Sequence, residues 1–256
     1  MTDRHTRLLK IVADKKSIEV SKLSEILNVS QVTIRKDLSA LEQKGLLHRK
    51  HGYALIGSSD DINSRLAVDY DIKKKIAHLA SELVCDGETV MIESGSCCTL
   101  LAEELAYNKK DITIITNSVF IASYIREASV RKASSAKVIL LGGEYQMESQ
   151  VLTGPLTRKD AKNFFVDKLF VGTDGYNKKI GFTGKDLMRT ETVKAMAESA
   201  NKLIVLTESS KFFQQGVVAQ FTTDEVDFVV TDDKIPENIL EYLKKCKIDV
   251  RQVFIK

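Results

Sequence analysis

The sequence predicts a two-domain α/β protein, in which a small, mainly helical domain precedes a larger domain with a mainly parallel sheet. Apolar residues recur with helical spacing through most of residues 3–42. From residue 89 onward, short continuous apolar runs alternate with helical segments, as in sheets that helices cover. Charge also differs between the two parts, with a net +5 over residues 1–56 and a net −2 over the remainder. This asymmetry predicts that only the N-terminal part binds a polyanion.

The composition is that of a globular protein. Hydrophobic residues make up 43% and charged residues 29% of the 256 residues, which is ordinary for such a chain. No apolar run is long enough to span a bilayer, and the charged start Met1–His5 does not resemble a secretion signal. Four cysteines without metal-binding spacing predict a reducing, cytoplasmic location. We expect no membrane association, no metal site and no cofactor.

Three helices are predicted in the N-terminal part. The first covers Asp3–Lys15, and Ser17–Val20 then interrupts the helical period. Ser21 is expected to cap a short second helix, and Asn28–Val29 to form the turn before a third helix that begins at Ser30. Two short helices joined by a tight turn form a helix-turn-helix.

The third helix, predicted over Ser30–Glu42, has two faces of different chemistry. One face is apolar and points toward a core through Ile34, Leu38 and Leu41. The other carries the side-chain types that a recognition helix places in a DNA major groove; these are Gln31, Val32, Arg35 and Lys36. An ordinary amphipathic surface helix is the alternative.

Individual roles on this helix follow from side-chain chemistry. We expect Gln31 and Arg35 to contact bases, and Lys36 to supply charge to the DNA. Thr33 either bonds a phosphate or has a plain surface role. Because the carboxylate of Asp37 would repel phosphates, we expect it to pair with an arginine or lysine.

A two-stranded wing is predicted after the third helix. Gly45 is placed to end that helix, and two β-prone runs, Leu46–Arg49 and Tyr53–Ile56, flank a turn at Lys50–Gly52. The basic side chains of this wing are expected to meet backbone phosphates. The full set of expected DNA-contacting residues is Ser30, Gln31, Val32, Thr33, Arg35, Lys36, Arg49, Lys50 and His51.

The polar segment Gly57–Ser64 predicts a domain boundary. We expect a DNA-binding domain over residues 1–57, a linker over 58–70 and an α/β domain over 71–256. Within the linker, Arg65–Tyr70 is predicted as an extended connection. Lys73–Val84 is predicted as a helix because its apolar residues have helical spacing.

The larger domain is predicted to be Rossmann-like. Continuous apolar strands joined by helices form a parallel sheet that is buried on both faces. Ligands of such sheets bind at the carboxyl ends of the strands. The predicted strands are residues 89–93, 112–116, 137–141, 168–171, 202–206 and 228–230.

The loop Ser94–Thr99 links a predicted strand to the start of a helix. Free amides and hydroxyls at such a turn suit an anionic oxygen cluster. The loop has neither the Gly-Lys-Ser/Thr ending of a Walker loop nor the GxGxxG dinucleotide motif, so the expected ligand carries a phosphate without a nucleotide. Asn117, Asp174 and Lys211 follow three other predicted strands and offer partners for hydroxyls and a phosphate.

Two groups of motifs resemble the DeoR family of bacterial transcriptional regulators. In the N-terminal part they are Thr33–Leu38, Leu41–Glu42, Gly45 and His51–Gly52. In the larger part they are Ser94–Ser96, Thr116–Ser118, Gly142–Gly143, Gly154, Gly172–Gly175, Gly181–Thr183, Glu191 with Lys194, and Ser209–Lys211. The resemblance covers nearly the whole chain. It implies a winged helix-turn-helix followed by a sensor domain similar in fold to ribose-5-phosphate isomerase.

The resemblance also implies an effector pocket for a phosphorylated sugar or polyol. Glu93 and Glu208 stand where the family has aspartates, Cys97–Cys98 replaces a Thr-Thr pair, and Tyr53 replaces a wing glycine. The effector-binding residues expected are Ser94, Gly95, Ser96, Cys97, Asn117, Gly143, Asp174, Gly175, Thr183, Glu191 and Lys211.

We therefore predict a DNA-binding transcriptional regulator that represses a carbohydrate-utilisation operon. Its expected partners are double-stranded operator DNA and a phosphorylated sugar or polyol. A single DNA-binding domain makes few base contacts, so a homodimer or homotetramer is expected.

Two alternatives remain at this point. A sugar-phosphate isomerase would use Glu191 and Lys211, but a basic helix-turn-helix serves no purpose in an isomerase, and we assign no catalytic residue. A redox switch at Cys97–Cys98 would use the lowered thiol pKa of a helix N-terminus; small buried side chains are the commoner explanation.

Overall fold

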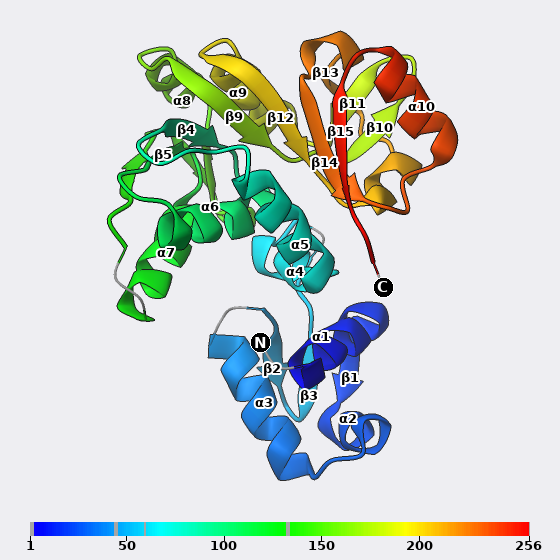
Figure 1. Cartoon of the computed structure of the whole chain (residues 1–256). Helices are drawn as coiled ribbons and strands as arrows, with labels where there is room; N and C mark the ends of the chain where they lie inside the picture. The colour runs from blue at the N-terminus through cyan, green and yellow to red at the C-terminus, as the bar shows by residue number, and fades with distance from the viewer. Residues whose placement is uncertain (1–2, 44–45, 59, 132–133, 256) are drawn as a thin grey trace. The chain divides into compact units, whose positions relative to one another are not determined.

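The computed structural model describes residues 3–43, 46–58, 60–131 and 134–255. The chain forms two compact units, Met1–Asp71 and Ile72–Lys256, whose helices and strands are labelled in Figure 1. None of the helices within the described ranges combines the length and the apolar character that crossing a membrane requires.

The first unit is a winged helix-turn-helix, which confirms the prediction. Its sheet is antiparallel, in the order β1–β3–β2. His51 and Gly52 have φ angles of 48° and 84° between β2 and β3, the backbone of a tight two-residue hairpin turn. The elements are α1 (Asp3–Lys15), β1 (Ser17–Glu19), α2 (Val20–Leu27), α3 (Gln31–Gln43), β2 (His48–Lys50) and β3 (Tyr53–Leu55).

The turn between α2 and α3 forms as predicted. Asn28 adopts the left-handed conformation at the end of α2, and Ser30 Oγ accepts a hydrogen bond from the Thr33 amide at 3.2 Å, which caps α3. The predicted cap at Ser21 is wrong, because its hydroxyl donates to the Glu19 carboxylate and α2 has no side-chain cap. The residue expected to end α3, Gly45, lies outside the described residues.

The apolar face of α3 builds the core of the first unit. Ile34, Leu38 and Leu41 are fully buried, as are Leu8 of α1 and Leu23 of α2. Each such side chain contributes about 1.5–3 kcal/mol when it leaves water. This burial fixes which face of α3 remains exposed.

The extended connection predicted at Arg65–Tyr70 is wrong. Helix α4 covers Ile62–Ala67, and α5 covers Tyr70–Ser81. The carboxylate of Asp61 caps α4 by accepting two backbone amides, and α4 packs against α1. The boundary between the units falls after Asp71, in the first turn of α5, so the segment expected as a linker belongs to the first unit.

The second unit is built on a seven-stranded sheet in the order β15–β14–β12–β9–β4–β5–β6, whose neighbouring strands are all parallel. This confirms the predicted mainly parallel α/β domain. Central residues such as Met91, Leu169 and Val205 are fully buried, as expected when both faces are covered. The strands are β4 (Thr89–Ile92), β5 (Thr113–Thr116), β6 (Lys137–Leu140), β9 (Val166–Val171), β12 (Ala200–Leu206), β14 (Phe228–Asp232) and β15 (Asp249–Val253).

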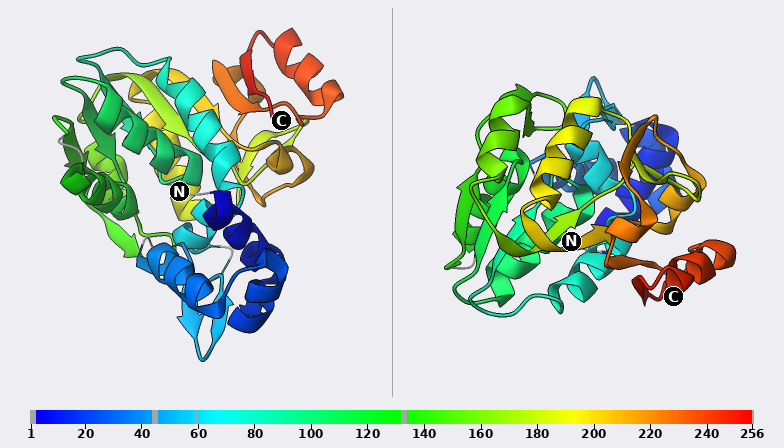
Figure 2. Two further views of the ribbon diagram at one scale, coloured as in Figure 1. Left: turned by 60° about the horizontal axis from the view of Figure 1, so that its bottom comes forward. Right: turned by 90° about the horizontal axis from the view of Figure 1, so that it is seen from above.

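Helices cover this sheet on both faces. Figure 1 shows α6 and α7 on one face and α8 and α9 on the other. In both views of Figure 2, α10 and β15 (red) lie at the edge of this unit opposite α7 (green). The helices are α6 (Ser96–Asn108), α7 (Val119–Arg131), α8 (Pro155–Ala161), α9 (Leu187–Ala197) and α10 (Glu237–Lys245).

The order of the strands reverses between β4 and β9. The chain proceeds outward from β4 to β5 and β6 on one side, and from β9 to β12, β14 and β15 on the other. In open α/β sheets such a reversal opens a crevice at the carboxyl ends of the two central strands, where ligands bind. Here those ends are Glu93–Gly95 after β4 and Gly172–Asp174 after β9.

Short antiparallel strands and 3-10 turns that the sequence did not predict are added to the parallel sheet. Tyr176 packs edge-on against Phe182 and Phe212, with ring centroids 5.1 and 5.6 Å apart, and fixes one small sheet beside the strand ends. The added elements are a hairpin of β7 (Glu144–Gln146) and β8 (Val151–Thr153), a sheet of β10 (Gly175–Asn177), β11 (Gly181–Gly184) and β13 (Val218–Phe221), and the 3-10 turns η1 (Ser209–Phe213) and η2 (Thr223–Glu225).

Candidate functional site

The exposed face of α3 presents the side chains expected to contact DNA. Gln31, Arg35 and Lys36 are exposed, whereas Ile34 between them is fully buried. Val32 is 60% exposed, although it is apolar and the core-facing side of α3 is already formed by Ile34, Leu38 and Leu41. An exposed small apolar group next to an amide and two cations suits contact with base edges and thymine methyl groups.

Local hydrogen bonds order this face. Arg35 Nη2 donates to Gln31 Oε1 at 3.4 Å, one helical turn away. Thr33 Oγ1 lies 2.9 Å from Ser30 Oγ, so the two hydroxyls share a hydrogen bond at the helix start. The guanidinium of Arg35 has five N–H donors, which leaves donors for a base or phosphate.

Glu42 at the end of α3 holds the wing through Arg49. Arg49 Nε donates to Glu42 Oε2 at 2.6 Å, and the Arg49 amide donates to Oε1 at 2.8 Å. This guanidinium holds the pKa of the Glu42 carboxyl below its usual range. The contact ties β2 to the candidate recognition helix, while Lys50 and His51 at the wing tip are exposed. Arg49 is thus already paired with a carboxylate.

Asp37 and Tyr53 of the first unit both have side-chain partners within it. Asp37 pairs with an arginine, as expected, namely Arg4 of α1. Tyr53 donates its hydroxyl to Glu19 Oε1 at 2.6 Å, across the β1–β3 pair. This hydrogen bond raises the pKa of Tyr53 and gives its hydroxyl a partner within the small sheet.

The carboxyl ends of β4 and β9 meet where the strand order reverses. Glu93 Oε2 accepts a hydrogen bond from the Gly172 amide at 3.0 Å. A Cβ atom added at Gly95 would lie 3.4 Å from Gly172 Cα, so the two glycines are in close apposition. Helix α6 begins at Ser96 with Gly95 as its N-cap, and Ser94 is buried beside it. The amide end of a helix therefore lies at the carboxyl ends of these strands, which favours an anion there.

A buried carboxylate, Glu208, lies at the end of the neighbouring strand β12. Cys97 Sγ donates to Glu208 Oε2 at 3.8 Å, and Lys73 Nζ of α5 lies 3.7 Å from Glu208 Oε1. Burial by itself would raise the pKa of Glu208, but attraction to Lys73 and Lys211 and hydrogen bonds, including that from Cys97, together outweigh burial, and the pKa lies below its ordinary value. The site thus joins a charged carboxylate to two cations from different elements.

The Cys97 thiol lacks the lowered pKa on which a redox switch depends. Burial raises the pKa of Cys97 well above its usual value, and the Glu208 carboxylate raises it further. Cys97 and Cys98 are both buried. The lowering that the redox-switch alternative requires is not found at Cys97, because desolvation of the thiolate is the larger effect.

Asn117 follows β5 and Asp174 follows β9, and both side chains are partly engaged in hydrogen bonds. Asn117 Nδ2 donates to the Leu152 carbonyl at 3.0 Å, while its buried Oδ1 has no hydrogen-bond partner within the described part of the chain. Asp174 accepts a hydrogen bond from the Lys185 amide at 2.9 Å. The orphaned acceptor of Asn117 can be satisfied by a ligand hydroxyl.

Gly143, Gly175 and Thr183 serve close backbone packing. A Cβ atom at Gly143 would overlap the Thr157 hydroxyl, and one at Gly175 would overlap the Gln214 carbonyl. Thr183 is fully buried, and its Oγ1 accepts from the Gly216 amide at 2.8 Å. These contacts give the three residues a role in building the small sheet and the β6–β7 turn.

Glu191 has its partners on the outer helices. It lies on α9, with its side chain 40% exposed, 3.8 Å from Arg158 of α8 and 3.7 Å from Lys194. Lys211 lies in η1, where its amide donates to the Glu208 carbonyl at 3.1 Å. In the described ranges no ion pair or hydrogen bond joins Glu191 to Lys211, so these contacts do not assemble the base and electrophile that the isomerase alternative needs.

Sequence reasoning missed Lys73 and treated Glu208 only as a departure from a family pattern. A signal for Lys73 was present, because it lies three and four residues before Ile76 and Ala77 and therefore on the buried face of α5. Lysine on an apolar helix face is ordinarily a residue whose head reaches water. Its burial here depends on a carboxylate supplied from the end of a distant strand.

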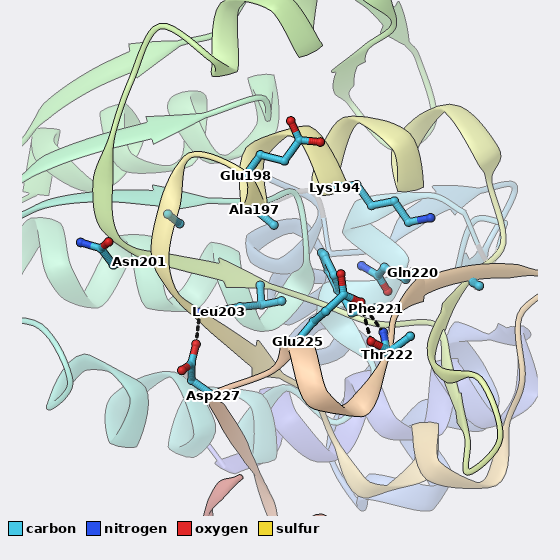
Figure 3. Close-up of a pocket in the computed structure, with 12 residues that line it drawn as sticks. Lys194, Ala197, Glu198, Asn201, Leu203, Gln220, Phe221, Thr222, Glu225 and Asp227 are labelled. Carbon is cyan, nitrogen blue, oxygen red and sulfur yellow. Dashed lines mark hydrogen bonds between the residues drawn. The ribbon is translucent and has the colours of Figure 1, made fainter. Parts of the chain in front are cut away.

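A pocket of about 480 Å³ opens elsewhere in the second unit, between α9, β12, β13 and the start of β14 (Figure 3). None of the effector residues predicted from the sequence lines it. Its carboxylates have partners, since Glu225 accepts from the Thr222 amide at 2.6 Å and Asp227 from the Leu203 amide at 2.9 Å. An acidic lining does not suit a phosphate, so the crevice at the strand ends is the candidate site.

Comparison with known proteins gives two family matches and relatives that span nearly the whole chain. Residues 68–233 match the DeoR C terminal sensor domain, and residues 4–60 match the DeoR-like helix-turn-helix domain. The HTH-type transcriptional regulator GolR of Listeria innocua is 28% identical over 97% of both chains. The transcriptional repressor AccR of Agrobacterium fabrum is 27% identical over 95% of both. The HTH-type transcriptional regulator UlaR of Shigella sonnei is 28% identical over 98% of both.

Among solved structures, ribose 5-phosphate isomerase A from Methanocaldococcus jannaschii aligns over 56% of this chain with a TM-score of 0.40 and 21% identity. The alignment spans about half of the isomerase, 55% of its length. eIF2B beta from Chaetomium thermophilum aligns over 95% of this chain and 70% of its own, with a TM-score of 0.45 and 12% identity. Similarities of this size carry no argument about activity.

Proposed function

The chain belongs to the DeoR family of transcriptional regulators, and from this premise we propose that it represses a carbohydrate-utilisation operon until a phosphorylated sugar or polyol binds its second unit. In this proposal the winged helix-turn-helix binds double-stranded operator DNA. The crevice at the carboxyl ends of β4, β9 and β12 binds the effector.

The exposed face of α3 supports the DNA half of the proposal. Three aliphatic residues bury one face of the helix, and the face left exposed carries an amide, two cations and Val32. Arg35 and Gln31 are proposed to contact base edges, and Lys36, Lys50 and His51 to contact phosphates. Arg49 is proposed to act chiefly through Glu42, because it holds the wing against α3.

The effector half rests on one observation in particular, the convergence of a helix N-terminus with Lys211 and Glu208 where the strand order reverses. The amide end of α6 and the ammonium group of Lys211 suit a phosphate. Glu208, Asp174 and the orphaned Oδ1 of Asn117 suit the hydroxyl groups of a sugar or polyol. Ser94, Gly95 and Ser96 would line the phosphate end.

We assign no catalytic role to this site. The relatives reported above are regulators, and a fold shared with enzymes does not carry their activity. Glu191, the base of the isomerase alternative, is ion-paired on the helical surface of the unit.

A homodimer or homotetramer is part of the proposal. A single recognition helix reaches few base pairs, and related helix-turn-helix proteins gain affinity by placing two heads on a repeated site. Light scattering of the protein with and without an operator duplex tests this part. A monomer that binds one half-site tightly would contradict it.

A thermal-shift screen tests the effector proposal. The purified protein is heated with fructose 6-phosphate, ribose 5-phosphate, mannitol 1-phosphate and similar compounds, and with each parent sugar or polyol as a matched control. A ligand that binds the native state raises the melting temperature by mass action. A rise limited to phosphorylated compounds supports the proposal. A rise with only the unphosphorylated compounds, or with none, would contradict the phosphate role of the Ser94–Thr99 loop.

A further inference from the structure

The charge cluster at the strand ends contains a cation that the proposed ligand contacts do not use. Lys73 has a side chain that is 2% exposed, and its Nζ lies 3.7 Å from Oε1 of Glu208, whose side chain is 11% exposed. Two charges taken out of water are retained only when they are mutually paired. The Lys73–Glu208 pair is therefore a fixed contact between α5 and the end of β12.

Backbone hydrogen bonds hold the main chain at Glu208, so only its side chain can move when the ion pair with Lys73 changes. The amide of the next residue, Ser209, donates to Asp232 Oδ2 at 2.7 Å, and the Glu208 carbonyl accepts from Lys211 at 3.1 Å. Both bonds fix the peptide unit that follows Glu208, and the preceding residue is fixed by the Thr207 amide, which donates to the Val230 carbonyl at 3.1 Å. The carboxylate itself reaches toward Cys97 and Lys73.

Helix α5, which carries Lys73, crosses the boundary between the two units. It covers Tyr70–Ser81, and the boundary between the units falls after Asp71. Lys73 lies two residues beyond that boundary, in the first turns of a helix that is continuous across it. A change in the position of Lys73 therefore acts on a helix whose first two residues, Tyr70 and Asp71, belong to the DNA-binding unit, where the turn Val68–Asp69 joins α5 to α4.

An effector in the crevice would act directly on this pair. Cys97 and Lys211, which border the crevice, both lie close enough to influence the charge of Glu208. A ligand hydroxyl donating to Glu208, or a phosphate next to it, competes with Lys73 for the carboxylate or repels it. Coupling of this kind requires that the effector bind the two arrangements of α5 with different affinities.

We propose that the Lys73–Glu208 ion pair couples the effector site to the DNA-binding unit, with effector contact at Glu208 loosening its hold on Lys73 and shifting α5. Lys73 is then a positioning residue that touches neither DNA nor effector. The inference rests on the proposed function, since it assumes an effector at the strand ends.

The test uses full-length Lys73→Met, with Lys74→Met as the matched control because Lys74 is the exposed neighbour on the same helix. Operator affinity is measured by fluorescence anisotropy on a duplex selected by the wild-type protein from a random library. Each protein is titrated with and without the phosphorylated compound that gives the largest thermal shift with the wild type, and inorganic phosphate serves as the minimal probe.

In the wild type and Lys74→Met, the compound is expected to lower operator affinity by a factor in the usual range for allosteric coupling, about 5–150. In Lys73→Met the compound still raises the melting temperature, but it changes operator affinity by less than about twofold on that scale. Lys73→Arg, which keeps the charge, restores most of the response. A Lys73→Met protein with the wild-type response overturns the inference, even if its melting temperature is lower.

Two further comparisons separate the possible failures. Because Lys73→Met leaves a buried carboxylate without this cation, Lys73→Met/Glu208→Gln removes both charges and provides a variant that avoids an unpaired buried charge. This double variant is also expected to lose the operator response. If the wild type itself binds the operator and ignores every phosphorylated compound, the proposed function fails and the inference falls with it. If the wild type responds and the double variant responds equally, the inference alone fails.

Discussion

Asp37 of the recognition helix α3 accepts two hydrogen bonds from the guanidinium of Arg4 on α1, at 2.5 Å from Nε and 3.0 Å from Nη2. His5 Nε2 lies 3.1 Å from the same carboxylate. A carboxylate on the DNA-binding helix is thereby neutralised from within the unit, and α3 is held to α1 at a buried position beside its apolar face. The hydrogen bond from Arg4 lowers the pKa of Asp37 below its ordinary value of 3.8.

This relationship predicts a pH-dependent effect of Asp37→Asn. Because the pKa of Asp37 is lower in the folded state, its contribution to stability is present above about pH 4 and is lost as the pH falls through the folded-state pKa. At pH 7 we expect Asp37→Asn to lower the free energy of unfolding by about 1 kcal/mol, since the partner Arg4 is half exposed. Calorimetry from pH 7 to pH 3 should show the two proteins converging; a constant difference would contradict the assignment.

The exposed face of α3 predicts a specific loss in Arg35→Ala. A base-contacting arginine is worth about 1–3 kcal/mol, so operator affinity should fall by about 5–150-fold with relaxed preference at one base position. Lys36→Ala should weaken all sequences alike and reduce the salt slope by about 1. Anisotropy titrations at several salt concentrations measure both effects. Lys10→Ala on α1 is the control, because Lys10 is exposed and lies on a different helix.

Two neighbouring glycines predict opposite outcomes. A Cβ atom at Gly175 would overlap the Gln214 backbone, whereas one at Gly172 would lie 3.6 Å from Gly95 Cα, in ordinary contact. Gly175→Ala should therefore destabilise the second unit by about 1–3 kcal/mol through overpacking. Gly172→Ala should melt close to the wild type but narrow the crevice and weaken effector binding. Equal melting temperatures in the two variants would contradict the packing role of Gly175.

Burial and pKa predict the order in which the cysteines react. Cys85 is exposed, and Cys97 and Cys98 are buried, with the pKa of Cys97 raised. Because the thiolate is the nucleophile, native protein should be alkylated by iodoacetamide first at Cys85, and at Cys97 and Cys98 only after unfolding. Peptide mass spectrometry measures the order. Rapid alkylation of Cys97 in the native protein would restore the redox-switch hypothesis.

Much of the fold could be predicted from local patterns. The spacing of Ile34, Leu38 and Leu41 gives both the existence of α3 and its buried face, and continuous apolar runs give the central strands. The extended connection predicted at Arg65–Tyr70 is wrong although the sequence contains a helix signal, because Asp61 is a favourable N-cap residue directly before α4. The strands β10, β11 and β13 are three or four residues long, too short for a periodic pattern to emerge.

The candidate site could be predicted only where a residue is adjacent in sequence to the end of a strand. Ser94 and Lys211 follow apolar runs, so their positions at the crevice follow from the topology. Lys73 could not be placed in this way, because its role depends on the ion pair with Glu208, which forms only when the whole sheet is assembled. For Thr183, the family motif predicts a ligand contact. In the structure its hydroxyl accepts a hydrogen bond from the Gly216 amide, a contact that no local pattern in the sequence predicts.

The most direct test of the division of labour compares Arg35→Ala with Lys211→Ala in the same two assays, operator anisotropy and effector-induced thermal shift. Arg35→Ala should weaken operator binding by about 5–150-fold and keep the full thermal shift, because the exposed face of α3 is proposed to contact DNA and not the effector. Lys211→Ala should keep operator binding and lose the thermal shift, because its ammonium group would neutralise the effector phosphate at the strand ends. If either variant loses both activities equally while its melting temperature matches the wild type, the assignment of DNA binding to α3 and of effector binding to the crevice is contradicted.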